Sequence, residues 1–478
     1  MSDGPIRSVC VVGNGIVALS AAAAFARALP GVALHIVETP PDPTALADTP
    51  CASLPSIHHF HAAIGLDEAA LLGEGAATHL LGTRFAGWSA SGSPWIHAFG
   101  EHGLNAGEVP FHMLWHRARI AGRAAPFHCH SAAATLAAAD KFVHPSADPA
   151  SPLAGFLYGL RLERVAYGNR LGTLTADIPH RTFLAAERDM RGIAALRLTD
   201  GTAITADLYL DCTGPQALLR ASLDPEFEPW DAWLPCDHIR FGAGSDAPLS
   251  PLDRVEAQPN GWRRTSSRPG HVRTVQAWSS RFADTGQEPA VIAIRPGRRP
   301  CPWAGNVLAL GDAATALDPL YGAPLHLAQA GILLALELLP GRGNSPIALA
   351  EYNRRFAEEA LGVRDFLALH YVRSGRSEPF WTEAAGQKLP ASLARIVEQF
   401  ERRGRIPPSE AEGVDRESWI AALIGLGVEP GTVNPLADSV DPDKAAAAID
   451  ALAGRIAAIP AGVPPYPEYL ARMRAGGR

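Results

Sequence analysis

The sequence lacks the patterns that mark metal-bound, disulfide-stapled and secreted proteins. Its six cysteines are scattered over 478 residues and form no Cys-x-x-Cys pair, so neither a zinc ribbon nor a dense disulfide framework is expected. The first seven residues are polar and contain no apolar signal-peptide core. The longest apolar runs, 16–29 and 331–339, are interrupted by Arg27 and Glu337 and fall short of a membrane span. We therefore expect a cytoplasmic protein with no membrane partner.

Other classes are excluded by charge and by missing catalytic motifs. With 42 basic and 49 acidic residues, the formal net charge of -7 argues against nucleic acid as a partner. Neither a Gly-x-Ser-x-Gly elbow nor a P-loop occurs, so no motif indicates acyl or phosphoryl transfer. His58, His59 and His61 do not share one helix face, and we expect no metal site there.

The first forty residues carry a dinucleotide-binding pattern. Residues 8–12 predict a buried strand, an alanine-rich helix follows until Pro30, and residues 32–37 predict a second strand. Gly13 permits a tight turn, and Gly15 leaves room for a pyrophosphate at the helix N-terminus. The alternative is a glycine-rich turn without a ligand, but strand, helix and acid all agree with the motif. The predicted nucleotide-binding residues are Gly13, Asn14, Gly15, Ile16, Val17, Ala18 and Glu38, whose carboxylate can accept the ribose hydroxyls.

Two later segments identify the dinucleotide as FAD. Residues 206–214 predict a strand that ends in a Thr-Gly turn, and residues 306–314 predict a strand that enters Gly311-Asp312. The Asp312 carboxylate can meet the ribityl chain, and the N-terminus of the following helix can face the flavin ring. The alternative is that Asp312 is an ordinary helix cap. No second glycine-rich fingerprint occurs, so a built-in NAD(P)H domain is not expected.

Over nearly its whole length the chain resembles the flavin-dependent tryptophan halogenases. Residues 77–85 (ATHLLGTRF) resemble the family's ATFKLGIRF segment, and residues 206–214 resemble its ADLFIDCTG segment. Residues 364–371, 379–381 and 418–438 resemble the C-terminal part of the family.

The resemblance implies an α/β, FAD-binding Rossmann-like fold of the aromatic hydroxylase and halogenase type. It implies an FAD-binding domain at 1–45 and 195–350, an inserted substrate-side portion at 50–195, and a helical C-terminal part at 350–478. The further cofactor contacts that it implies are Ser53, Leu54, Gly311, Asp312, Pro319, Gly322 and Ala323.

In that family a lysine directs hypochlorous acid, formed at the flavin, onto an aromatic ring, and a glutamate assists. The lysine position reads Leu80 in this sequence, and the glutamate position reads Tyr321. Leucine has no amine, and near neutral pH a phenol is not an anionic base. The Ser-Thr pair near the family's halide site reads Gly322-Ala323. The family's GEAT strap reads PCAS at 50–53.

The resemblance also implies a substrate site at Leu80, His97 and Phe99. Residues two apart on an extended chain point to the same side, so Phe99 can stack on a flat ring while His97 hydrogen-bonds it. The alternative is that both are ordinary packing residues. Tyr321 and His97 are then the candidate catalytic, proton-handling groups.

Three functions are compatible with this sequence. The favoured one is an FAD-dependent monooxygenase or oxidase of an aromatic or planar small molecule, without halide chemistry. The alternatives are an unconventional halogenase and a non-catalytic flavin- or ligand-binding homologue. The candidate protein partners are a separate flavin reductase, implied by the family, and a second copy of the chain in a homodimer.

Overall fold

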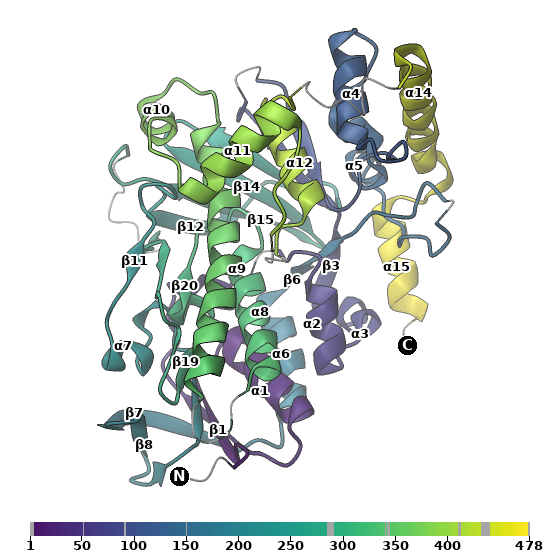
Figure 1. The fold of residues 1–478 in the computed structure, drawn as a ribbon. Helices are drawn as coiled ribbons and strands as arrows, with labels where there is room; N and C mark the ends of the chain where they lie inside the picture. Colours follow the sequence, from purple (N-terminus) through teal and green to yellow (C-terminus); the bar gives the residue numbers. More distant parts are fainter. Residues whose placement is uncertain are drawn as a thin grey trace.

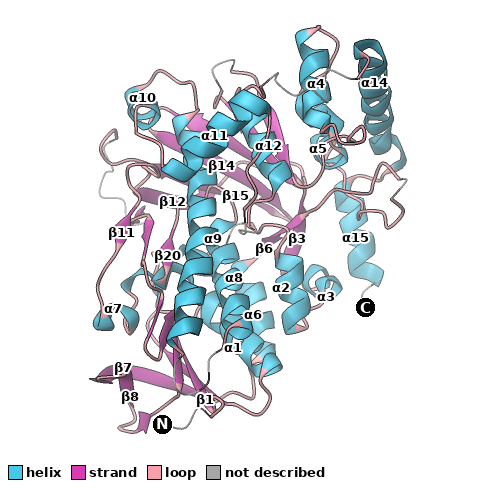
Figure 2. Cartoon of the chain, viewed as in Figure 1, coloured by secondary structure: helices cyan, strands magenta, loops and turns pink. Residues whose placement is uncertain are grey.

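The computed structural model describes residues 4–50, 52–89, 92–149, 151–283, 291–339, 341, 345–409, 413–431 and 440–476. Over these residues the chain forms a mixed α/β fold built on two large sheets, with helices packed against both (Figures 1 and 2). The α/β fold class expected from the sequence is therefore confirmed.

The first sheet has eight strands and a parallel centre in which β1 lies between β10 and β2. Residues 9–12 of β1 are fully buried, as expected for a central parallel strand. In sheet order the strands are β18 Trp303–Ala304, β19 Val307–Ala309, β10 Leu208–Asp211, β1 Ser8–Val12, β2 Ala33–Glu38, β7 His180–Asp189, β8 Gly192–Leu198 and β9 Ala203–Ile204.

Helix α1 (Ile16–Ala28) connects β1 to β2 and forms the expected βαβ unit. Its alanines are short enough for close packing against α6 (Arg164–Leu174) and α8 (Ala323–Glu337). Strand β1 has the predicted bounds, and helix α1 ends at Ala28, two residues before the predicted stop at Pro30. Observed and predicted bounds agree this closely because the signals that define them are local in the sequence.

The second sheet has seven strands and brings together distant parts of the chain. Strand β13 pairs in parallel with β4, whereas the other neighbours are antiparallel. In sheet order the strands are β16 Val291–Ala293, β12 His238–Ala243, β15 His271–Trp278, β14 Gly261–Arg268, β13 Leu252–Gln258, β4 Gly82–Ala86 and β5 Trp95–Ala98. The smaller sheets contain β3 Ala77–Leu80 with β6 Gly159–Leu162, and β11 Glu228–Pro229, β17 Gly297–Arg298 and β20 Thr315–Ala316.

Long helix α9 (Pro346–Val372) links the two sheets (Figure 1). It packs along α8 and contacts β18 of the first sheet, while Tyr371 near its end accepts a hydrogen bond from Trp262 of β14 in the second sheet. The remaining helices are α2 Ile57–Ile64, α3 Glu68–Gly73, α4 Phe111–Ile120, α5 Ala132–Ala138, α7 Arg220–Leu223, α10 Pro379–Ala385, α11 Ala391–Arg403, α12 Arg416–Gly425, α14 Pro442–Ala458 and α15 Tyr466–Gly476.

Within the described residues, one helical stretch, Pro442–Gly462, is long and apolar enough to cross a bilayer. Length and composition alone are weak evidence, since the core helix of a soluble protein passes the same test. Helix α14, which makes up most of this stretch, packs beside α4 and α5 and buries an apolar face of Ala446, Ile449, Leu452 and Ile456 (Figure 1).

The expected portions do not each form one sheet. Strands β12 to β16 come from the range 195–350 assigned to FAD binding, yet they join β4 and β5 in the second sheet. Strand β7, from the range assigned to the substrate side, pairs with β2 in the first sheet. The strands of the predicted FAD-binding and substrate-side portions are thus interleaved between the two sheets. The division of the chain into domains stays a prediction.

Candidate functional site

A large cavity opens at the carboxyl ends of β1 and β2, where the sequence predicts the nucleotide. Its volume is about 1060 Å³, and Asn14, Gly15, Ile16 and Glu38 line it. Gly13 has a φ of +133°, and a Cβ there would lie 2.6 Å from the Cys212 carbonyl oxygen, so this turn requires glycine. The geometry of the tight turn therefore agrees with the motif.

Asp48 occupies the space that Gly15 leaves open. Its Oδ1 accepts the backbone N–H of Val17 at 2.8 Å, and a Cβ on Gly15 would lie 2.0 Å from Oδ2. Burial raises the pKa of Asp48 to about 6. The chain thus holds its own carboxyl group at the N-terminus of α1, where the motif places a pyrophosphate. Sequence reasoning missed Asp48, because no motif marks the loop that carries it.

Asp312 retains an unused hydrogen-bonding oxygen. Its Oδ2 accepts the Ala47 N–H at 2.8 Å, whereas Oδ1 is buried without a partner among the described residues. Burial, reinforced by the charge of Asp48, raises the pKa of Asp312 to about 7. The side chain also lines a smaller hollow of about 250 Å³ with Pro215 and Leu317. A buried acceptor of this kind needs a donor, and a ribityl hydroxyl would supply one.

The residues present therefore fit FAD once the Asp48 carboxyl group leaves the space above Gly15. Gly13 and Gly15 shape the turn, Glu38 stands at the end of β2, and Asp312 offers a free oxygen. In this structure Glu38 Oε1 lies 2.8 Å from His180 Nδ1, on the same cavity wall. Of the other predicted contacts, Val17 and Ala18 are buried in the first turn of α1, and Gly311 packs against Val17.

The described residues of the predicted strap include Ala52 and Ser53, and the next residue, Leu54, lies at the wall of a second cavity. Ser53 exchanges two 2.8 Å hydrogen bonds with Leu160 of β6, through its backbone N–H and its Oγ. A Cβ on Gly322 would lie 2.5 Å from the Ala52 carbonyl oxygen, so the turn before α8 presses on the strap. Leu54 and Ala323, predicted as cofactor contacts, line the second cavity. Cys51, in the same predicted strap, lies outside the described residues, as does the 432–439 part of the C-terminal resemblance.

The second cavity has a volume of about 340 Å³ and is largely aromatic and aliphatic. His97, Phe99, Tyr321 and Phe366 contribute to its wall, as does Asp415. Few polar groups in an apolar hollow of this size suit a small planar molecule. The structure thus brings together three of the predicted residues, His97, Phe99 and Tyr321.

His97, which contributes to this wall, has one ring nitrogen without a partner among the described residues. Its Nε2–H donates to the Ser418 carbonyl oxygen at 3.2 Å, so the neutral ring carries its lone pair on Nδ1. Nδ1 is buried and has no hydrogen-bond partner in the part of the chain that the structure describes. Burial lowers the pKa of His97 to about 4, which keeps the ring neutral near pH 7. The Phe99 ring stands almost perpendicular to it, with the centroids 6.1 Å apart.

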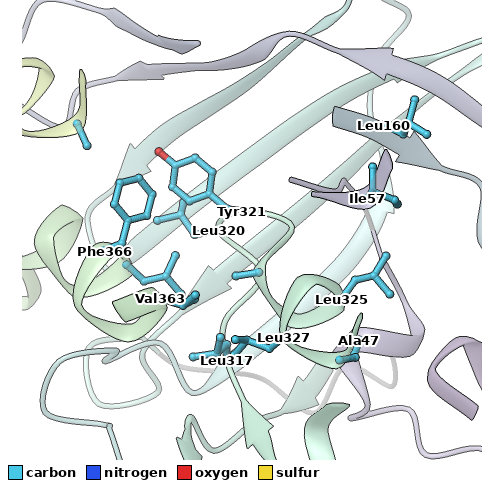
Figure 3. Packing of buried hydrophobic residues seen from close by; sticks show 14 of the residues in the cluster. Ala47, Ile57, Leu160, Leu317, Leu320, Tyr321, Leu325, Leu327, Val363 and Phe366 are labelled. Carbon is cyan, nitrogen blue, oxygen red and sulfur yellow. The ribbon is translucent and has the colours of Figure 1, made fainter. Parts of the chain in front are cut away.

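Tyr321 points its hydroxyl proton at His370. His370 Nδ1–H donates to the Phe366 carbonyl oxygen at 2.9 Å, so Nε2 accepts the Tyr321 hydroxyl at 3.0 Å. Burial lowers the pKa of His370 to about 3 and raises that of Tyr321 well above its ordinary value, so both groups are neutral. Figure 3 shows the Tyr321 ring beside Phe366. His370 lies in the 364–371 segment that resembles the family, but no sequence signal pairs it with Tyr321, because the two residues are far apart in the chain.

Leu80 lies behind Phe99 rather than on the cavity wall. It is buried in a small cluster with Ala52 and Phe99, and the cavity lining does not include it. The whole sequence contains three lysines, Lys141, Lys388 and Lys444. None of them lines this cavity among the described residues. The prediction that Leu80 contacts substrate stays a prediction.

A dinucleotide cavity that fits FAD, together with an aromatic hollow, defines the class of FAD-dependent oxidoreductases. The sequence pattern of the family described as tryptophan halogenase matches residues 8–442, and the chain belongs to that family. This membership confirms both the resemblance and the FAD cofactor expected from the sequence.

Similar proteins support the assignment along the whole chain. BrvH, a flavin-dependent halogenase from Brevundimonas sp. BAL3, is 30% identical, with a TM-score of 0.91 over 98% of this chain and 99% of that one. Xcc4156, a flavin-dependent halogenase from Xanthomonas campestris, is 29% identical, with a TM-score of 0.90 over 98% of each chain. Tryptophan 7-halogenase KtzQ from Kutzneria sp. is 23% identical, and the alignment covers 100% of both chains.

Proposed function

We propose that this family member oxygenates or oxidises an aromatic small molecule in the second cavity without transferring halogen. The observation that carries the proposal is the lack of an amine: the described lining contains no lysine, and Leu80 stands at the family's lysine position. At the glutamate position, Tyr321 is neutral and its proton is directed to His370. Losing groups that act directly on the transferred atom commonly costs about 10²–10³ in rate for each group.

The chain's own residues would bind and orient the substrate. His97 Nδ1 accepts a hydrogen bond from an N–H or O–H group of the substrate, because its Nε2–H is held by Ser418. Phe99 and Phe366 pack against the ring system, and the neutral Tyr321–His370 pair closes the wall. His97 therefore sets the orientation of the ring and is the one free imidazole acceptor in the described lining.

FAD, when bound, supplies the electrons that reduce oxygen or accepts those that the substrate loses. In an oxygenation, one atom of O₂ enters the substrate and the other leaves as water. Since the sequence has one glycine-rich fingerprint, we propose that a separate flavin reductase delivers the reduced cofactor.

The halide dependence of the product tests this function. The FAD-loaded protein, a flavin reductase and NADH are incubated in air with indoles and phenols in buffers containing chloride, bromide or no halide. We expect products that have gained one oxygen atom or lost two hydrogens, in equal yield in all three buffers. A product that carries the isotope pair of bromine would overturn the proposal in favour of an unconventional halogenase.

Replacing His97 by phenylalanine is expected to raise KM about fivefold, because one buried hydrogen bond is worth about 1 kcal/mol. The effect should appear for substrates with a free N–H or O–H and vanish for their N- or O-methylated analogues. Exposed His59 provides the matched control as His59→Phe. Equal losses for both kinds of substrate would contradict the hydrogen bond and assign His97 to packing.

A further inference from the structure

Three histidines converge on one carboxylate outside the two cavities. Glu68 is the first residue of α3, and His58 and His79 lie on α2 and β3. His144 follows on the loop before β6. From the carboxylate oxygens of Glu68, His58 Nδ1 is 3.2 Å away, His79 Nε2 is 3.3 Å away and His144 Nε2 is 3.2 Å away.

The opposite nitrogen of each imidazole is held by an oxygen outside the cluster. This arrangement fixes each ring so that its remaining nitrogen faces Glu68, as second-layer hydrogen bonds do in metal sites. The distances are 2.9 Å from His58 Nε2 to Tyr158 O, 3.1 Å from His79 Nδ1 to Tyr466 Oη, and 2.5 Å from His144 Nδ1 to Tyr469 Oη.

The deepest of these nitrogens has no hydrogen-bond partner. His79 is fully buried, and its Nε2 makes no hydrogen bond to any described residue although Glu68 Oε1 is near. The donor atoms of Glu68, His79 and His144 all lie within 4.8 Å of one another. Tetrahedral zinc with ligands at about 2.0–2.1 Å separates its donor atoms by about 3.3 Å, close to the nitrogen–oxygen distances observed.

We propose that this cluster is a site for a divalent first-row transition metal, with Zn²⁺ as the best match. Glu68, His79 and His144 are its ligands, and His58 Nδ1 contacts the other carboxylate oxygen of Glu68, Oε2, at 3.2 Å. Neutral imidazoles and one carboxylate suit zinc in charge and in ligand type. Spacing alone could not reveal the site, because its residues come from four separate segments. His59 is exposed, and His61 instead contacts Tyr167.

The metal would tie the C-terminal helix to the wall of the substrate cavity. Tyr466 and Tyr469, which hold two of the ligands, belong to α15. His79 and Leu80 are neighbours on β3 and face opposite sides, so the strand that carries the ligand also supports Phe99 through Leu80. The site is therefore structural, and it does not depend on the proposed reaction.

Cobalt provides the test, because tetrahedral Co²⁺ with nitrogen ligands absorbs visible light. Full-length protein without a histidine tag is stripped with a chelator and titrated with Co²⁺, and then with Zn²⁺. We expect one equivalent of Co²⁺ to give an intense visible band, Zn²⁺ to abolish it, and Zn²⁺ to raise the Tm. His144→Ala and Glu68→Gln should lose both effects, whereas His59→Ala should keep them.

Two results would overturn the site. One is a wild-type protein that shows no visible band or binds Co²⁺ without a defined stoichiometry. The other is a band of unchanged strength in both His144→Ala and Glu68→Gln. His144 and Glu68 are only part-buried, so both variants should fold, and an unchanged far-UV circular dichroism spectrum checks this. If the band is absent, the cluster is a hydrogen-bonded histidine–glutamate network only.

Discussion

Replacing Asp253 by alanine is expected to lower the free energy of unfolding by about 3–5 kcal/mol, because it leaves two guanidinium groups buried without their anion. Asp253 and Arg161 are fully buried, and Arg264 is nearly so. Arg161 Nε donates to Oδ1 at 2.6 Å, and Arg264 Nε donates to Oδ2 at 2.7 Å. Urea denaturation followed by tryptophan fluorescence measures the loss.

The pH dependence of this contribution has a defined sign. Burial alone would raise the pKa of Asp253, but the two arginines lower it to about 2. A depressed carboxyl pKa stabilises the folded state fully above about pH 4, and the contribution is lost as the pH falls towards 2. The difference between wild type and Asp253→Ala should therefore shrink on acidification.

The exposed pair Arg197–Glu187 is the control for this prediction. Both side chains are about half exposed, so Glu187→Ala should change the free energy of unfolding by less than about 1 kcal/mol. A loss at Asp253 no larger than the loss at Glu187 would contradict the account. Arg264 also donates to the Pro319 carbonyl oxygen at 3.3 Å, so the buried triad helps to hold the turn that leads to Tyr321.

The parts of the molecule that the sequence predicts well are those with local signals. The run 8–12, the alanines after Gly15 and the stop at Pro30 define β1 and α1 within about one residue. Gly13 has a positive φ and a Cβ there would clash with Cys212, so the turn needs the glycine that the motif already specifies. The wider fold followed from the family resemblance rather than from any single pattern.

What the sequence could not predict depends on contacts between distant segments. Tyr321 and His370 are 49 residues apart in the chain. The sequence around each residue therefore gives no sign that the Tyr321 hydroxyl donates a hydrogen bond to the His370 imidazole. Burial, which neutralises both groups, is likewise a property of the assembled core. The position of Asp48 over Gly15 arises in the same way, because the loop after β2 folds back onto α1.

Removing the carboxylate of Asp48 is expected to tighten FAD binding about 10–100-fold at pH 7. The pyrophosphate and the Asp48 carboxylate compete for the same N-terminus of α1, where one anion is favourable and two repel. With a pKa of about 6, Asp48 is mostly ionised at pH 7, and protonating it there costs about 1.4 kcal/mol, or a factor of ten. Isothermal titration calorimetry of the FAD-free protein measures the affinity.

Two variants distinguish whether Asp48 weakens FAD binding by its charge or by the volume of its side chain. Asp48→Asn removes the charge and keeps an oxygen that can accept the Val17 N–H, whereas Asp48→Gly also opens the space above Gly15. If repulsion dominates, both variants should gain affinity to a similar degree. If volume dominates, only Asp48→Gly should do so. Equal affinity in wild type and both variants would contradict the competition, since Asp48 would then swing away at no cost.

The pH profile provides the last discriminating measurement. A bound phosphate raises the pKa of a neighbouring carboxyl, so FAD binding takes up a proton and wild-type affinity should rise as the pH falls from 8 to about 6, then level off. Arg164, Asp42 and Asp312 face Asp48, and Asp312 titrates near pH 7. Asp48→Asn retains Asp312 but removes the charge that helps to raise its pKa. A slope that survives in this variant, shifted to lower pH, therefore belongs to Asp312, and the part that disappears belongs to Asp48.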